Sequence, residues 1–262
     1  MAKYALRGVA LVYLLFLLVL PIVLIVWRTF EHGAGQVIAA LTTPSALHAI
    51  WITAIVAVAS VIANTIFGLG VAILLVRHDF PGKRVLNAFI DLPLAVSPVV
   101  VGLALILVYG TNTPVGGWLA QHGLPIIFSI PGMVLATIFV SLPLVVRAVA
   151  PVLEEVGIEQ EQAAWTLGAT PLQAFRRITL PAIRWALGYG VVLSLARSLG
   201  EYGAVAVVSG RIVDQTQTLT LFVEERFNDF DQPAAYAAAF ALALVAVVSL
   251  LLVKLLRPKD RV

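Results

Sequence analysis

Six stretches of about 20 mostly apolar residues divide this sequence, and they constrain its fold more than any other feature. They run approximately over 9–27, 50–76, 89–109, 126–146, 186–208 and 234–253. A helix of about 20 residues rises about 30 Å, which is the thickness of the hydrocarbon core of a bilayer. The alternation of apolar and polar residues that marks barrel strands is absent from all six stretches. We therefore predict an all-α polytopic membrane protein with six transmembrane helices.

The composition agrees with this location, because 61% of the residues are hydrophobic and only 12% are charged. Soluble domains carry about 25% charged residues. The absence of cysteine excludes disulfides, thiolate catalysis and cysteine-ligated metals, and a net charge of +3 gives no indication of nucleic-acid binding. The first stretch is longer than the core of a signal peptide, and Trp27-Arg28 follows it instead of a small-residue cleavage site. We interpret it as a retained span.

Lys and Arg residues are distributed unequally between the connections. One set of connections, which includes both termini, holds 13 of them with Arg147 among the count, and the opposite set holds only Arg28, Arg211 and Arg226. The positive-inside rule then places both termini in the cytoplasm. The connection between the fifth and sixth stretches is net acidic on the outside. It is either a solvated loop or a docking rim for an external partner, because complementary surface charge guides encounter.

The longest inner connection, 148–185, has the features of a folded element. Four acidic residues suit the positive end of a short helix, and they are Glu154, Glu155, Glu159 and Glu161. Gly168 is placed to end this helix. A second helix start follows, with Thr170 as N-cap, Pro171 at N1 and Gln173 at N3 of a capping box. We predict two short helices joined at an angle.

Short amphipathic helices of this kind are marginal in water, so the segment should pack against something. One alternative is its own bundle or the lipid interface, and the other, which we favour, is a protein partner. The spacing is specific, since Gln162-Ala163-Ala164 is followed by three residues, Gly168, nine residues and Ile178-Thr179-Leu180-Pro181. This run resembles the EAA loop of bacterial ABC importer permeases, which contacts the ATPase subunit. Gln162 stands where that family has Glu, although Glu159 and Glu161 are close by.

The resemblance implies that a defined set of residues couples this chain to an ATPase, namely Glu159, Glu161, Gln162, Ala163, Ala164, Gly168, Ile178, Leu180 and Pro181. Three further segments are similar to the W-type permease subunits of sulfate/thiosulfate ABC importers: 91–98 (DLPLAVSP), 116–118 (GGW) and 196–204 (ARSLGEYGA). Molybdate and tungstate permeases share the Gly-Glu-aromatic-Gly-Ala pattern of the last segment. The first segment is therefore the narrower indication of sulfate.

The resemblance also implies a type I ABC importer permease fold, half of a translocation pathway, and a bacterial inner-membrane location. The implied partners are a second, T-type permease, two ATPase subunits that bind ATP and Mg, an external sulfate-binding protein and membrane lipid. This chain would then bind no cofactor or metal itself, and it would not be an enzyme. The implied regions are a first helix and outer loop over 1–45, a permease domain over 46–256 with a coupling loop over 148–185, and a tail over 257–262.

Prolines interrupt two of the stretches, at Pro93, Pro98, Pro131 and Pro143. Each removes a backbone hydrogen bond, and the freed carbonyls must meet protein or water. Either Ser97 and Thr137 meet this need locally, or Ser97 and Gly102 line a path.

Arg197 and Glu201 are the ionisable residues well inside the fifth stretch. Each would cost about 2.5–3.5 kcal/mol at mid-membrane, so neither should face lipid. Their i, i+4 spacing allows them to pair. They either neutralise each other, or Arg197 gives positive potential to an anion route while Glu201 fixes its position.

Other functions find less support in the sequence. There is no GxxxxGK[ST] phosphate loop, and the four histidines lie outside or at the edges of the apolar stretches without an HExxH pairing. A stand-alone secondary transporter would leave the long inner connection without a purpose, and no inverted repeat is evident. A non-transporting scaffold would leave Arg197 and Glu201 unexplained.

Overall fold

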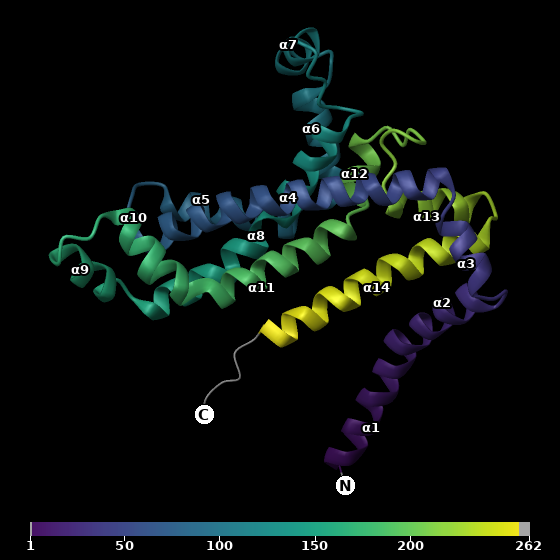
Figure 1. The fold of residues 1–262 in the computed structure, drawn as a ribbon, viewed down its shortest axis with the longest axis horizontal. Coiled ribbons are helices and arrows are strands. Elements are labelled where there is room, and N and C mark those ends of the chain that lie inside the picture. Colours follow the sequence, from purple (N-terminus) through teal and green to yellow (C-terminus); the bar gives the residue numbers. More distant parts are fainter. Residues whose placement is uncertain (1, 257–262) are drawn as a thin grey trace.

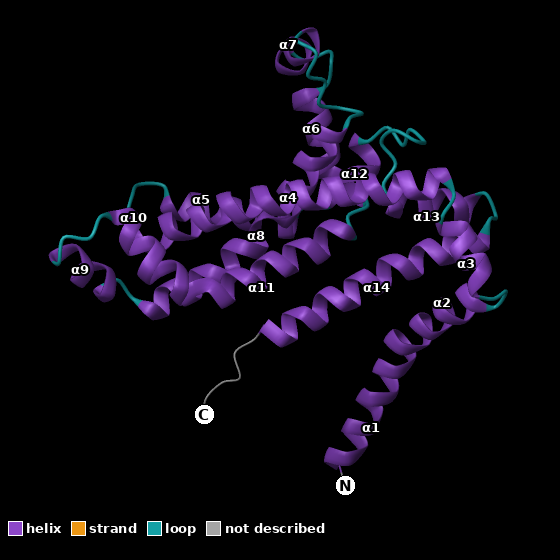
Figure 2. Cartoon of the chain, in the orientation of Figure 1, coloured by secondary structure: helices purple, strands orange, loops and turns teal. Residues whose placement is uncertain are grey.

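The computed structural model describes residues 2–256, and every regular element in that range is a helix (Figure 2). The first part of the chain contains α1 (Ala2–Leu14), the π-helical turn η1 (Leu15–Val19), α2 (Leu20–Phe30), α3 (Ala34–Leu41), α4 (Pro44–Arg77), α5 (Lys83–Ala95), α6 (Pro98–Tyr109) and α7 (Pro114–Gln121). The second part contains α8 (Ile130–Val156), α9 (Glu159–Thr166), α10 (Pro171–Ala174), the π-helical turn η2 (Phe175–Thr179), α11 (Leu180–Leu199), α12 (Gly203–Val208), α13 (Leu219–Asn228) and α14 (Gln232–Leu256). The expected tail over 257–262 lies outside the described residues.

Helices α4, α8 and α11 pack along one another and form the centre of the bundle, and α14 lies against α11 (Figure 1). Glycines allow these helices to approach closely. A Cβ atom on Gly68 of α4 would lie 2.9 Å from the Cβ of Val145 in α8. A Cβ atom on Gly190 of α11 would lie 3.1 Å from the Cα of the same valine. Small residues at helix contacts are a common means of packing in membranes, where lipid and protein interior are equally apolar.

Within the described residues, five helices are long and apolar enough to cross a membrane, and a bent pair makes a sixth. The first, second and sixth predicted spans are confirmed by helices over Leu6–Phe30, Pro44–Arg77 and Gln232–Leu256. The fourth span continues ten residues beyond the predicted end, to Val156. Glu154 and Glu155 therefore belong to the end of α8, and the prediction that they open the following short helix is wrong.

The third stretch is not a straight span, because α5 and α6 meet at an angle of 115°. Pro98 is the first residue of α6, and the preceding Ser97 has a ψ of 134°. A residue before proline is driven out of the helical region by the proline ring, which explains the break. Figure 1 shows α6 and α7 projecting away from the bundle as a result.

The fifth stretch also differs from its prediction. The long helix begins at Pro171, runs through η2 and ends at Leu199, while residues 203–208 form the separate helix α12. Gly200 caps α11, and Glu201 and Tyr202 connect the two helices. The bundle therefore has two distinct ends, with α9 and α10 at one and α12 and α13 at the other (Figure 1).

Candidate functional site

Two short helices form an elbow, defined here as residues 157–179, at one end of the bundle. Gly168 ends the first of them with a φ of +85°, and the N–H of Ala169 donates to the carbonyl of Ala164 at 3.0 Å. The capping box at the second is complete, since the N–H of Gln173 donates to Oγ1 of Thr170 and the N–H of Thr170 donates to Oε1 of Gln173. Both predicted features, the stop at Gly168 and the restart at Thr170, are confirmed.

One face of the elbow is turned away from the bundle. Gln162, Ala163 and Gly168 of the expected coupling set are exposed on it, together with Leu167, which is 89% exposed. Leu172 of the second short helix is also exposed, at 64%, and large apolar side chains exposed together indicate a surface that meets another molecule. The rest of the expected set lies around this face: Glu159 and Pro181 are exposed, while Ala164, Ile178 and Leu180 are half-buried.

The other face of the elbow is fastened to the bundle by Glu161. Its Oε1 atom lies 3.0 Å from Nη2 of Arg77, the last residue of α4, and also accepts a hydrogen bond from Thr179 at 2.9 Å. The same guanidinium donates to the carbonyls of Leu153 and Gly157, where α8 ends. The two charged side chains are only 8% and 11% exposed. Four segments, α4, α8, α9 and η2, are therefore joined at one point.

The sequence did not identify Arg77 as a site residue, because it is only one of the 13 Lys and Arg residues of the inner connections. Its only sequence signal is its place directly after an apolar stretch. A cavity of about 520 Å³ lies behind the elbow, bordered by Arg77, Glu161, Trp165 and Phe175. The Arg77–Glu161 pair is therefore a principal tether of the elbow to the spans.

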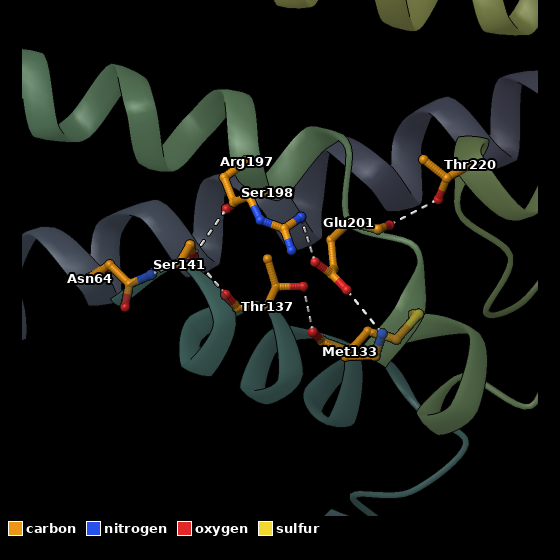
Figure 3. A network of polar contacts seen from close by, with 9 residues as sticks. Asn64, Met133, Thr137, Ser141, Arg197, Ser198, Glu201 and Thr220 are labelled. Carbon is orange, nitrogen blue, oxygen red and sulfur yellow. Dashed lines mark hydrogen bonds and ion pairs between the residues drawn. The ribbon is translucent and has the colours of Figure 1, made fainter. Parts of the chain in front are cut away.

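A second ion pair, half-buried, joins Arg197 near the end of α11 to Glu201 in the break that follows (Figure 3). Nη1 of Arg197 is 2.7 Å from Oε2 of Glu201, so the predicted pairing is confirmed. Glu201 is 3% exposed and lies in the break after α11, where its Oε1 accepts the N–H of Ala204 at 2.9 Å. This carboxylate thus binds the positive N-terminal end of α12 as well as Arg197. The side chain of Arg197 is 38% exposed.

Buried polar side chains extend this cluster along the bundle (Figure 3). Ser198 and Ser141 are 3.4 Å apart through their hydroxyls, and Nδ2 of Asn64 donates to Ser141 at 2.7 Å. The hydroxyl of Thr220 donates to the carbonyl of Glu201 at 3.0 Å, which links α13 to the break. The sequence analysis did not identify Asn64 as a site residue, although a single amide side chain within an apolar stretch could have indicated it. Helices α4, α8, α11 and α13 thus share one polar network.

The other two residues expected along a path occupy different environments. Ser97 is exposed at the bend between α5 and α6, and its hydroxyl makes no capping hydrogen bond. Gly102 is buried against α12, where a Cβ atom would lie 2.7 Å from the Cβ of Val207 and 2.9 Å from the carbonyl oxygen of Ala204. This close approach accounts for the glycine at position 102 by packing.

A third ion pair joins α5 and α8. Arg147 lies inside α8, nine residues before its end at Val156, so it belongs to the helix and not to a loop that follows the fourth span. The cause is the extra length of α8, which the hydrophobic pattern did not mark. Arg147 binds Asp91 through two nitrogens, at 2.8 and 2.6 Å.

The acidic connection at the α13 end carries paired charges. Arg211 contacts Glu224 at 3.1 Å, and a cavity of about 250 Å³ lies between these residues, Glu225 and Asp229. The hydrogen bond that Tyr202 makes with the Glu224 carboxylate raises the pKa of this tyrosine. Among the described residues, no group of three or more histidine, aspartate or glutamate side chains could hold a metal ion.

These features define a class of protein. A helical bundle with five or six candidate spans, ion pairs between its helices and an exposed elbow fastened to its core is a polytopic membrane protein. The chain belongs to the binding-protein-dependent transport permeases, since residues 64–262 match the family described as "Binding-protein-dependent transport system inner membrane component".

Similar proteins carry transport names. The "Sulfate transport system permease protein CysW" of Synechocystis sp. is 48% identical over 98% of this chain and 93% of its own length. The protein of the same name from Escherichia coli K12 is 46% identical, over 97% and 88%. The "Sulfate transport system permease protein CysT" of Salmonella typhimurium is 40% identical, over 94% and 87%.

The fold is also similar to solved structures. A chain of a bacterial ABC transporter involved in import of the acidic polysaccharide alginate gives a TM-score of 0.80 at 17% identity, over 99% of this chain and 96% of that chain. A second structure of an alginate ABC transporter, in complex with an alginate pentasaccharide-bound periplasmic protein, gives 0.79 at 18% identity, over 96% and 92%. The predicted all-α importer-permease fold is confirmed, and the chain is a transport subunit of the membrane.

Proposed function

We propose that this chain is a permease subunit of a sulfate ABC importer, in which it forms half of the translocation pathway and couples that pathway to a separate ATPase. The names of the CysW and CysT relatives support sulfate as the substrate. Molybdate and tungstate permeases, the alternative from the sequence, find no support among those relatives. One observation carries the coupling: an exposed apolar elbow is bound to the ends of α4 and α8 through Arg77 and Glu161.

The proposed assembly contains this chain, a homologous T-type permease, two ATPase subunits that hold ATP and Mg, and an external sulfate-binding protein. The CysT relative supports the permease pair. The alginate transporter that was solved with a substrate-bound periplasmic protein supports an external binding protein in assemblies of this fold. Both termini would lie in the cytoplasm with the elbow. The regions would be 1–45 for the first helix and outer loop and 46–256 for the permease domain.

The mechanism follows from how the elbow is held. The ATPase would dock on the outward face that carries Gln162, Ala163 and Leu167. When the ATPases close on ATP, they displace α9, and the Arg77–Glu161 pair passes this displacement to the ends of α4 and α8. The tilting spans would then open the pathway alternately to the two sides. Arg197, fixed by Glu201, and Ser97 at the bend are the proposed pathway residues.

Uptake of labelled sulfate into proteoliposomes that contain all the subunits tests this proposal. We expect ATP-dependent uptake that requires both permeases and the ATPase. Excess unlabelled thiosulfate should compete more strongly than molybdate or tungstate. Uptake that survives omission of the ATPase would overturn the coupling, and stronger competition by molybdate would overturn the proposed substrate.

A further inference from the structure

Arg147 occupies the one exposed position in the middle section of α8, between residues 132 and 150. All the remaining residues of α8 between 132 and 150 are buried or half-buried, because α4 and α11 pack along this helix. The side chain of Arg147 is 39% exposed. Apolar residues flank it on both sides, and the next charged residue along α8 is Glu154. Of the candidate spans in the described residues, α8 has the largest buried share, and the residue it leaves exposed within 132–150 is an arginine.

We expect lipid to be an unfavourable neighbour for this side chain, because α8 is one of the helices long and apolar enough to cross a membrane. Arg147 lies nine residues before the end of α8, about 14 Å along the helix axis. A charged group within the hydrocarbon costs several kcal/mol unless it meets protein or water. Asp91, its ion-pair partner, is itself 47% exposed. The open face of the pair must therefore be covered by water or by another chain.

The guanidinium is held in one orientation by α5. Its Nε and Nη2 atoms donate to the two carboxylate oxygens of Asp91 at 2.8 and 2.6 Å, and Nη2 also donates to Oδ1 of Asn87 at 3.0 Å. Within the part of the chain that the structure describes, Nη1 has no partner. A bidentate carboxylate fixes the plane of the arginine, so the free Nη1 edge is aimed without further ordering.

We propose that Arg147 is a contact residue for the transported oxyanion in the half of the pathway nearer the elbow. This inference rests on the proposed transport of a divalent oxyanion. The free N–H edge can donate to an anionic oxygen, whereas the Asp91 charge limits how tightly the anion is held. A transport site needs this balance, because an anion must be able to leave each site along its route. Arg197 with Glu201 repeats the same arrangement toward the other end of the bundle.

A thiol placed beside Arg147 tests its exposure to an aqueous anion route. The chain has no cysteine, so Asn87→Cys gives a single thiol within the contact range of Arg147. The assembled importer in inside-out vesicles is treated with two methanethiosulfonate reagents of similar size, one anionic and one cationic. We expect the ratio of the anionic to the cationic rate to be at least several-fold higher than for a free thiol in solution, because the unpaired Nη1 edge of Arg147 favours an approaching anion. The ratio of the two rates removes any general change in thiol reactivity.

Two matched variants in this background give opposite predictions. Arg147→Gln, which leaves Asp91 uncompensated, should lower the anionic-to-cationic rate ratio below that of a free thiol in solution, whereas Asp91→Asn, which leaves the arginine uncompensated, should raise the ratio further. Changes of opposite sign would show that both charges act on an aqueous space that reaches the thiol, whereas a pair enclosed between α5, α8 and a further chain would leave the thiol unreactive. A thiol that reacts with neither reagent, with and without ATP, would show that a partner chain or lipid covers this face. That result, or a ratio that Arg147→Gln leaves unchanged, would overturn the proposal.

Transport gives the second readout. In the otherwise native chain, Arg147→Gln should lower ATP-dependent sulfate uptake by roughly tenfold or more, the scale of one lost charge-assisted hydrogen bond, while Arg147→Lys should retain more uptake. The variant should still co-purify with its partner subunits. Loss of co-purification would assign Arg147 to a subunit interface instead and overturn the inference. The thiol rates do not depend on which oxyanion is carried, so a wrong substrate and a wrong role for Arg147 give different results.

Discussion

Arg77 and Glu161 join the last residue of α4 to the first turn of α9, with Nη2 and Oε1 3.0 Å apart and both side chains nearly buried. The same Oε1 atom accepts a hydrogen bond from the hydroxyl of Thr179, so one carboxylate oxygen binds both the end of α4 and the turn η2. The angle of the elbow to the spans therefore depends on an interaction between residues that are far apart in the sequence. Variants of this pair can distinguish its contribution to the stability of the fold from its proposed role in coupling ATP hydrolysis to uptake.

We expect Arg77→Met to destabilise the chain by about 3–5 kcal/mol, because Glu161 would remain buried without a counter-charge. The melting temperature of the purified importer in detergent measures this loss. The double variant Arg77→Met/Glu161→Leu should recover most of the stability, since an apolar pair of similar size often replaces a buried ion pair at little cost. Lys83→Ala, which breaks an exposed pair with Asp79, is the control and should leave the melting temperature unchanged.

The same double variant tests the coupling itself. If the ion pair transmits motion, ATP hydrolysis should continue in the stable double variant while sulfate uptake per ATP hydrolysed falls. A double variant that recovers both stability and coupled uptake would contradict the proposed role of the pair.

Substitutions at Gly168 should be graded by their tolerance of a positive φ. The space around this glycine is open, so the reason for a glycine is its φ of +85° and not crowding. Gly168→Val should be the most disruptive, since a branched residue in the left-handed region costs about 1–3 kcal/mol, and Gly168→Asn the least. Gly168→Asp should fold similarly to Gly168→Asn but place a charge on the outward face. If that face docks the ATPase, co-purification of the ATPase should fall for Asp more than for Asn. Equal recovery of the ATPase with both variants would argue against docking at this junction.

Gly102→Ala separates packing from a role in the pathway. The added methyl group would lie 2.7 Å from the Cβ of Val207, so we expect a loss of about 1–3 kcal/mol in stability from overpacking. Gly188→Ala on α11 meets nothing within 4 Å and should be neutral or slightly stabilising. Thermal unfolding of both variants measures the difference. A Gly102→Ala protein of native stability that no longer transports sulfate would instead place this residue in the pathway.

Glu201→Gln should affect uptake more than assembly. The amide can still accept the N–H of Ala204 through its oxygen, but Arg197 loses its counter-charge and is free to reorient. We expect slower release of the anion and therefore a lower maximal uptake rate, with little change in subunit co-purification. Arg197→Gln should be more damaging to stability, because it leaves the Glu201 carboxylate charged and 3% exposed. Equal maximal uptake by Glu201→Gln and the unmodified importer would exclude a role for the pair in transport.

Local patterns in the sequence were sufficient for much of this molecule. The apolar lengths predict where spans lie, and the elbow follows from Gly168 and the Thr170 capping box, because caps and φ preferences act within a few residues. The Arg197–Glu201 pair is also local, at four residues apart. The turn between α5 and α6 could have been placed at Ser97, since Pro98 excludes a helical residue before it.

Contacts between distant segments could not be predicted in this way. The partnership of Arg77 with Glu161, the packing of Gly102 against Val207 and the place of Arg147 within α8 all depend on how helices far apart in sequence lie against each other. A hydrophobic pattern states only that a segment prefers an apolar environment, and it is the same whether lipid or protein supplies it. Which residues meet which, and which charged side chains are left at an open face, is decided only when the helices pack, because that packing sets the neighbours of every buried charge.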